Sequence, residues 1–194
     1  MPKALELVDL LAEIRACRHC EDDLPLGPNP VVRASTSAKV LIVGQAPGTR
    51  VHQTGIPWND PSGDRLRDWL ALDHDTFYDE GKIAIVPMGF CYPGKGKSGD
   101  LPPRPECADL WHERVLAAMP EIELVLLIGR YAQVRYLGNS RETLTARVHR
   151  WQEFGPRFIP TPHPSPRNTL WLRRNPWFED EVVPAMRERV AALL

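Results

Sequence analysis

The chain has 194 residues, a length that suits one domain with a sizeable core. Its 24 basic and 25 acidic side chains nearly cancel, which excludes a global cationic signature for nucleic acid but is compatible with a local basic patch. There is no apolar run of about 18 residues, and the first residues lack the apolar segment of a secretory signal. We therefore expect a cytoplasmic protein, monomeric and without a membrane span.

The apolar pattern divides the chain into short strands and helices. Residues 5–17 carry apolar side chains at helical spacing, and a connector rich in Pro, Asn and Asp spans residues 21–37. Two long loops are expected at residues 44–62 and 89–105. Strands are predicted at residues 40–43, 83–86, 124–128 and 158–159. Further helices are predicted at residues 64–72, 105–119, 130–137 and 176–194.

Short apolar strands that alternate with helices indicate a parallel sheet covered on both faces. Neither an internal repeat nor a low-complexity stretch interrupts this pattern. We therefore predict an α/β fold, a three-layer α/β/α sandwich with a central four-stranded parallel sheet, in a single domain of residues 1–194.

Two rigid polar segments follow predicted strands. After the first strand comes Gly44-Gln45-Ala46-Pro47-Gly48, and after the fourth comes His163-Pro164-Ser165-Pro166-Arg167-Asn168. In an open α/β sheet, ligands bind in the crevice at the carboxyl ends of the strands. Proline-stiffened loops at that edge would preorganise a pocket. We expect the two segments to bind one ligand together.

The four cysteines form a second group. Cys17 and Cys20 make a C-x-x-C pair after the first helix, while Cys91 and Cys107 stand in and after the second long loop. One pair of cysteines close together in the sequence and two more far along the chain are typical of a four-thiolate site. A reducing cytosol disfavours disulfides. Such a site binds zinc or an iron–sulfur cluster. Buried cysteines without any ligand are the alternative.

Several motifs together resemble the uracil-DNA glycosylase superfamily. The C-x-x-C pair, the strand that ends in Gly-x-Ala-Pro-Gly and the segment Thr54-Gly55-Ile56-Pro57 look like its iron–sulfur families 4 and 5. The stretch Asn59-Asp60-Pro61-Ser62-Gly63-Asp64 looks like a family 5 segment. The second loop is similar to that of the single-strand-selective monofunctional glycosylases. The resemblance covers nearly the whole chain as a mosaic of branches.

The resemblance implies a [4Fe–4S] cluster with a structural role on Cys17, Cys20, Cys91 and Cys107, with zinc as the alternative. It also implies that the substrate is a deaminated or damaged base in DNA. Excision of such a base requires a donor for the departing base, an anion near the sugar cation and a surface for stacking.

His163 is the candidate donor, because Pro162 and Pro164 fix its loop and a neutral imidazole still carries one proton. A histidine that only caps local backbone is the alternative. The first loop has Gln45 and Ala46 where relatives place an acidic or polar residue. Asp60 is therefore the candidate carboxylate, by its resemblance to the family 5 segment, although a turn residue before Pro61 is the competing interpretation.

The remaining substrate contacts are assigned to the first loop, a tryptophan and the second loop. Trp58 occupies the place of a stacking aromatic, with a core tryptophan as the alternative. No asparagine stands near the end of the second strand, where uracil-selective relatives carry one, so we expect altered or broader base choice. The predicted substrate-binding residues are Gly44, Gln45, Ala46, Pro47, Gly48, Trp58, Ser165 and Asn168.

Basic and apolar side chains follow the second loop. Such a composition matches apolar wedges flanked by phosphate-binding arginines, although an amphipathic surface turn is the alternative. The predicted DNA-binding residues are Arg167, Leu170, Trp171, Arg173 and Arg174.

Our leading hypothesis is a monofunctional DNA glycosylase of base excision repair, because neither loop contains a lysine for Schiff-base chemistry. The first rival is a weakly active or inactive module of the same fold that binds damaged DNA. The second is a hydrolase of free nucleosides or nucleotides.

Overall fold

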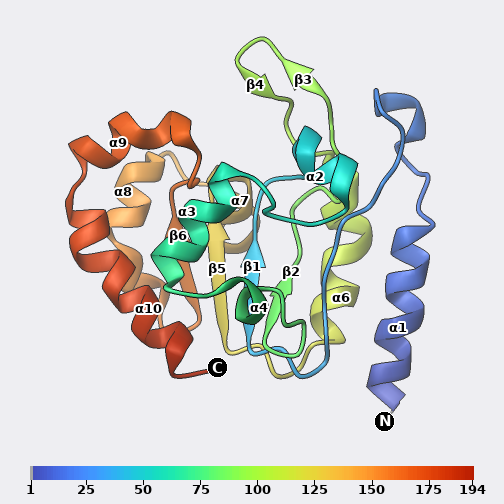
Figure 1. Cartoon of the computed structure of the whole chain (residues 1–194), viewed down its shortest axis with the longest axis horizontal. Helices are drawn as coiled ribbons and strands as arrows, with labels where there is room; N and C mark the ends of the chain where they lie inside the picture. Colours follow the sequence, from blue (N-terminus) through green and yellow to red (C-terminus); the bar gives the residue numbers. More distant parts are fainter. Residues whose placement is uncertain (1) are drawn as a thin grey trace.

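The computed structural model describes residues 2–194, with side chains from Glu6 onward. At its centre is a four-stranded parallel sheet with the strand order β2-β1-β5-β6 (Figure 1). Each strand is a short apolar run, as expected for a sheet covered on both faces. The predicted three-layer α/β/α fold is thereby confirmed. The strands are β1 (Val40–Val43), β2 (Ile83–Ile85), β5 (Leu124–Ile128) and β6 (Phe158–Thr161).

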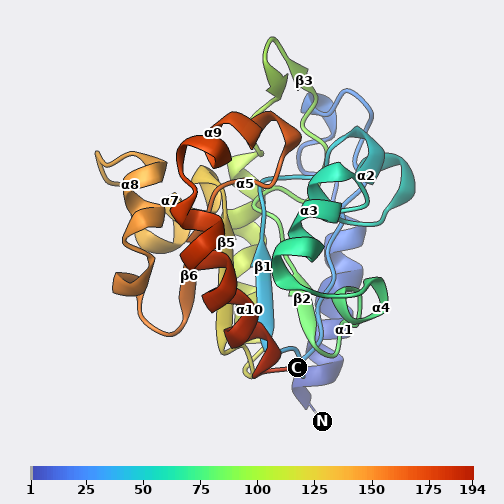
Figure 2. The same cartoon turned by 60° about the vertical axis from the view of Figure 1, so that its left-hand side comes forward.

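Alternate side chains of each strand enter two separate cores. In β1, Leu41 and Val43 belong to the core that contains the first helix, whereas Val40 and Ile42 belong to the core beneath the C-terminal helix. The period of two that every strand has produces this division. Figure 2 shows the C-terminal helix in front of the sheet and the first helix behind it.

The helices and helical turns surround this sheet. Those of the first half are α1 (Pro2–Arg15), η1 (Glu21–Asp23), α2 (Thr49–Thr54), α3 (Pro61–Leu70) and α4 (His74–Phe77). Those of the second half are α5 (Pro105–Cys107), η2 (Ala108–His112), α6 (Glu113–Ala117), α7 (Arg130–Leu137), α8 (Leu144–His149), η3 (Trp151–Phe154), η4 (Pro166–Asn168), α9 (Thr169–Arg174), η5 (Phe178–Val182) and α10 (Val183–Ala191).

The expected elements recur with several differences. The two longest predicted helices, 105–119 and 176–194, contain the π-helical segments η2 and η5. Short helices that the apolar pattern did not predict, among them α2 and α8, lie between the expected elements. The second predicted long loop contains a small antiparallel hairpin, β3 (Lys95–Gly96) and β4 (Gly99–Asp100), which rises above the carboxyl edge of the sheet (Figure 1).

Buried polar side chains fix the segments that lead to this edge. Gln133 on α7 is 1% exposed, and its Nε2 donates to the Thr161 carbonyl oxygen at 2.9 Å and to the Leu127 carbonyl oxygen at 3.3 Å. It therefore ties the ends of β5 and β6 together just before the second loop. Within the described residues, no helix has the length and apolarity needed to cross a membrane.

Candidate active site

The two predicted loops meet at the carboxyl edge of the sheet and line two adjoining cavities. An inner recess of about 50 Å³ also contacts Val31, Ile85 and Pro87. An outer cleft of about 370 Å³ extends from it toward the hairpin. Both cavities are lined by Gln45, Ala46, Pro47, Gly48, Asp60 and His163. Segments from distant parts of the sequence thus enclose one space, as expected at the edge of an open α/β sheet.

Every residue predicted to be catalytic or substrate-binding lines one of these cavities. Gly44 and Trp58 line the inner recess, and Ser165 and Asn168 line the outer cleft. Arg167, predicted to bind DNA, also lines the outer cleft. The structure therefore brings these residues together, whereas their chemical roles remain predictions.

His163 presents a defined tautomer to the cavities. The Ser165 backbone N–H donates to His163 Nδ1 over 3.2 Å, so the neutral ring carries its proton on Nε2. Burial lowers the pKa of His163, and this effect outweighs the nearby Asp60, which raises it. The ring is therefore neutral at pH 7. A neutral imidazole of this kind can donate one hydrogen bond to a developing anion.

Asp60 combines a structural position with a place in the cavities. Its Oδ1 accepts a hydrogen bond from the Gly63 backbone N–H at 2.8 Å, which caps the N-terminus of α3. This cap explains why α3 begins at Pro61 rather than at the predicted Asp64. Asp64 instead pairs with Arg67 at 2.6 Å. Asp60 therefore has the structural role before Pro61 that was the competing interpretation, and it also lines the cavities of the candidate site.

Trp58 has a strained backbone that places its ring beside His163. Its φ is 57°, in the left-handed region that bulky residues rarely adopt. The ring centroids of Trp58 and His163 are 5.6 Å apart, with 35° between the planes. A Cβ on Gly44 would lie 2.8 Å from the indole, and a Cβ on Gly63 would lie 1.6 Å from the Trp58 carbonyl oxygen. Only glycine at these two positions permits the close approach.

Two residues that the sequence did not mark hold this turn in place. The Arg67 Nη1 donates to the Trp58 carbonyl oxygen at 3.2 Å, and the Tyr78 hydroxyl donates to the Pro57 carbonyl oxygen at 2.7 Å. Strain that is over-determined by its surroundings is characteristic of functional sites.

The second loop is held by hydrogen bonds of its own and by α3. Asn168 Nδ2 donates to the His163 carbonyl oxygen at 2.8 Å, and the Ser165 hydroxyl accepts from the Arg167 backbone N–H at 3.2 Å. Arg65 on α3 donates from Nη1 to the Ser165 carbonyl oxygen at 3.0 Å. Asn168 and Arg65 therefore position the loop that carries His163, and Arg65 was not predicted.

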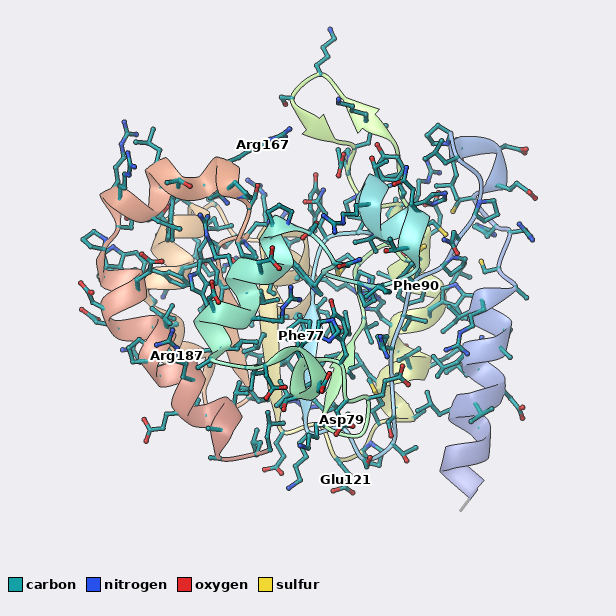
Figure 3. All side chains as sticks on the ribbon, viewed as in Figure 1. Phe77, Asp79, Phe90, Glu121, Arg167 and Arg187 are labelled. Atoms are coloured by element: carbon teal, nitrogen blue, oxygen red, sulfur yellow. The ribbon has the colours of Figure 1, made fainter. Side chains whose placement is uncertain are left out.

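The hairpin contributes a third wall that was not predicted. Ser98, Gly99 and Asp100 line the outer cleft. Arg167 extends toward the hairpin, where its Nη1 donates to the Ser98 carbonyl oxygen at 3.1 Å (Figure 3). From the first loop, Gln45 Nε2 donates to the Leu101 carbonyl oxygen at 3.4 Å. Both predicted loops thus contact the hairpin.

The end of β2 forms the apolar side of the inner recess. Among the described residues that line the recess there is no asparagine, and Pro87 occupies this side. The Pro87 carbonyl oxygen accepts from Nε2 of the buried His112 at 2.8 Å, and Nδ1 of His112 then accepts from the Tyr136 hydroxyl at 2.9 Å. Burial lowers the pKa of His112 to about 4. His112 is therefore a neutral positioning residue for the recess.

The residues predicted to bind DNA on α9 differ in accessibility. Leu170 is 56% exposed, and Arg173 and Arg174 are also exposed. Trp171 is only partly exposed, because its ring packs against the second core and its Nε1 donates to the Thr145 hydroxyl at 2.8 Å. Trp171 is therefore held against the second core, and Leu170 is the more exposed apolar side chain of α9. DNA contact by either residue stays a prediction.

The four cysteines are free thiols that lie close enough for their charges to interact. Burial raises the pKa of Cys107 to about 12, and charges on Cys17, Cys20 and Cys91 also contribute to this increase. Within the described residues, no group of three or more His, Cys, Asp or Glu side chains has an arrangement that could hold a metal ion. The four thiols are the donor types of a four-thiolate site, and metal or cluster binding by them stays a prediction.

A comparison with protein families places these features in a known context. The family model described as the Uracil DNA glycosylase superfamily matches residues 32–187. The match spans the parallel sheet, the hairpin and both loops of the site. It includes Cys91 and Cys107 but begins after Cys17 and Cys20.

Proposed function

The chain belongs to the uracil DNA glycosylase superfamily, and from this membership we propose that it is a monofunctional DNA glycosylase of base excision repair. The superfamily supports DNA glycosylase activity in general, with DNA as the partner. The proposed reaction is hydrolysis of the N-glycosidic bond of a flipped, deaminated or damaged base. The observation that carries the proposal is that His163 and Asp60 line the same cavities, with the proton of the neutral His163 on Nε2.

The proposed mechanism assigns one task to each of three side chains. Bond cleavage leaves negative charge on the base and positive charge on the sugar. His163 donates from Nε2 to the departing base and stabilises its anion. Asp60 faces the sugar and stabilises the cation. Trp58 offers the flipped base a stacking surface, which helps to offset the few kcal/mol that unstacking costs.

The reaction stops at base release. A strand-cleaving glycosylase forms a Schiff base with an amine nucleophile. Among the described residues that line the two cavities there is no lysine. We therefore expect an abasic site in an intact strand as the product.

Base choice is expected to be broader than uracil alone. Without an asparagine in the recess, the side-chain amide that can read a base edge there is Gln45. The proposal is tested by measuring release of free base from oligonucleotides that carry uracil, hydroxymethyluracil, hypoxanthine or xanthine. Release above the His163→Ala background for at least one base supports it, and no release for any of them would refute the enzymatic function.

A second candidate function is that of a module that binds damaged DNA without releasing the base. The first loop favours it, because Gln45 and Ala46 supply no acid to activate water. This candidate predicts salt-dependent DNA binding without release of base. The lesion assay therefore separates the two functions.

We further propose that Cys17, Cys20, Cys91 and Cys107 hold a structural [4Fe–4S] cluster, with zinc as the alternative. Four thiols near one another and without disulfides are the donor chemistry of either group. When bound, the group would join the end of α1 to the segments around α5. A broad absorbance band near roughly 400 nm together with bound iron would support the cluster. Bound zinc without iron would support the alternative, and absence of both metals would refute the site.

A further inference from the structure

The β3–β4 hairpin brings a second carboxylate to the outer cleft. Asp100, on β4, lines this cleft together with Asp60 and His163. Its Oδ2 lies 3.5 Å from the point where a Cβ on Gly48 would stand. Asp100 therefore stands near Gly48, the last residue of the first loop, and lines the same cleft as Gln45 and Ala46, which supply no acid.

Contacts from both loops hold the hairpin in this position. Arg167 binds the Ser98 carbonyl oxygen in its turn, and Gln45 binds the Leu101 carbonyl oxygen at its base. These anchors lie on either side of Asp100 in the sequence. The backbone on both sides of Asp100 is thus held by the same segments that form the cavities, while the Asp100 side chain is exposed to the solvent of the outer cleft. A fixed backbone helps to preorganise a catalytic group.

On this basis we propose that Asp100 is the catalytic residue that activates water in this enzyme. The inference rests on the proposed glycosylase function and names the residue that acts as the general base in it. Asp60 has one carboxylate oxygen committed to the cap of α3, and it is left with the task of stabilising the sugar cation.

The proposed step consumes one water molecule. The water gives a proton to the Asp100 carboxylate while its oxygen bonds to C1′ of the sugar. The bond between C1′ and the base nitrogen breaks, and its electron pair leaves with the base, next to Nε2–H of His163. Asp100 then returns its proton to solvent, and the released base takes up one proton.

The charges around Asp100 suit this task. Partial loss of hydration beside the cleft wall raises the pKa of Asp100 most, Arg167 and Lys95 lower it, and Asp60 raises it by the smallest amount. A carboxylate with a raised pKa is a better general base near neutral pH. His163, which lines the same cleft, stays neutral because burial lowers its pKa. Base release should therefore fall as the pH drops through the raised pKa of Asp100.

The test compares single-turnover rates of base release by the wild type, Asp100→Asn and Asp60→Asn over a range of pH. The matched control is Asp75→Asn, because the Asp75 side chain is fully exposed on α4. We expect Asp100→Asn to release base about 100-fold more slowly than the wild type. The rate of this variant should no longer fall as the pH is lowered. Asp60→Asn should lose rate but keep that decline, and Asp75→Asn should match the wild type.

The outcomes separate this inference from the proposed function. If the wild type is active and Asp100→Asn has a rate within threefold of it and the same pH profile, the role of Asp100 is overturned. The proposed glycosylase function would stand in that case. A wild type that releases no base from any lesion would overturn the proposed function and, with it, the role of Asp100. Thermal unfolding checks that each variant is folded, and Asp100→Asn should bind lesion DNA as tightly as the wild type.

Discussion

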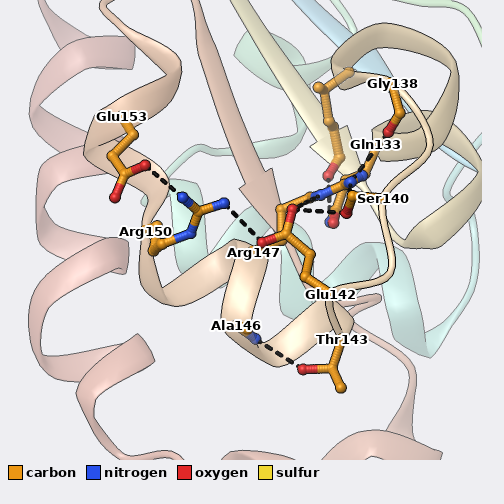
Figure 4. A network of polar contacts seen from close by, with 10 residues as sticks. Gln133, Gly138, Ser140, Glu142, Thr143, Ala146, Arg147, Arg150 and Glu153 are labelled. Atoms are coloured by element: carbon orange, nitrogen blue, oxygen red, sulfur yellow. Dashed lines mark hydrogen bonds and ion pairs between the residues drawn. The ribbon is translucent and has the colours of Figure 1, made fainter.

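The acidic side chains around α8 and those at the carboxyl edge of the sheet have different surroundings. Around α8, Glu142 pairs with the 6%-exposed Arg147 at 3.0 Å and with Arg150 at 2.7 Å, and Arg150 also pairs with Glu153 (Figure 4). At the carboxyl edge of the sheet, by contrast, the carboxylates of Asp60 and Asp100 face cavities. The first region pairs its charges within the protein, whereas the carboxylates of the second region line open cavities.

The pKa values follow this division. Hydrogen bonds from Arg147, Arg150 and Ser140 lower the pKa of Glu142 to about 2. Partial loss of hydration raises the pKa of the exposed Asp100, because Arg167 and Lys95 do not offset it. The two carboxylates therefore differ in direction, since the pKa of Glu142 is lowered and the pKa of Asp100 is raised.

The largest effect is expected for His163→Ala. Loss of the Nε2 donor should lower the single-turnover rate of base release by about 100- to 1,000-fold, the usual cost of removing one donor from an anion site. The matched control is His74→Ala, whose side chain is 71% exposed. Equal rates for the two variants would contradict the assigned role.

In the α8 region the effect should appear in stability instead. Glu142→Gln leaves the buried Arg147 without its carboxylate, so the free energy of unfolding should fall by roughly 3 kcal/mol. In Glu13→Gln, which breaks an exposed pair with Arg114, the loss should be much smaller, because solvent screens that pair. Denaturant unfolding measures both, and base release per folded molecule should not change in either. An equal loss in the two variants would argue against a structural role of the network.

The same network predicts how stability responds to acid. The folded pKa of Glu142, about 2, lies below its ordinary value of 4.5, so its stabilising contribution is complete above about pH 4.5. The contribution should be lost as the pH falls from there toward 2. The difference in unfolding free energy between the wild type and Glu142→Gln should shrink over this range. A difference that is constant with pH would show that the carboxylate is not the source.

A smaller effect is expected for Trp58→Ala. Loss of the stacking surface should weaken binding of lesion DNA by about 1 kcal/mol, or roughly fivefold, as is typical of an aromatic contact. Trp58→Phe should retain most of the affinity, since it keeps an aromatic face. Affinities measured by fluorescence anisotropy test the order, and equal affinity for Trp58→Ala and the wild type would remove Trp58 from the base contact.

The smallest effect concerns DNA phosphates. The double variant Arg173→Gln/Arg174→Gln should lower the dependence of log affinity on log salt by about 2, close to one for each lost phosphate contact. Lys39→Gln/Lys82→Gln removes two charges at the amino ends of β1 and β2 and is the control. If both variants have the same salt dependence, α9 does not contact phosphates.

Sequence patterns predicted the elements that depend on local apolar periodicity. The strands of the sheet are buried on both faces, so their runs stand out in the chain. The loops with His163 and Gln45 were found for a related reason, because rigid polar segments directly after such strands belong at one edge.

The remainder of the site depends on contacts that no local pattern encodes. Arg65 reaches the Ser165 carbonyl across 100 residues of sequence, so its positioning role becomes visible only in the fold. The hairpin has two strands of two residues each, too short for an apolar pattern. The local signal is the glycine-rich stretch 94–99, which predicts a turn or loop but not which residues pair. The position of Asp100 over the first loop could not follow from that signal.

The most direct test of the central claim is the stoichiometry of products from the wild type under single-turnover conditions. Free base and abasic sites are quantified together on the best lesion oligonucleotide. We predict equal amounts of both, in a strand that stays intact until alkali is added. A stable complex with lesion DNA that yields no free base, or base release accompanied by strand cleavage, would contradict a monofunctional glycosylase.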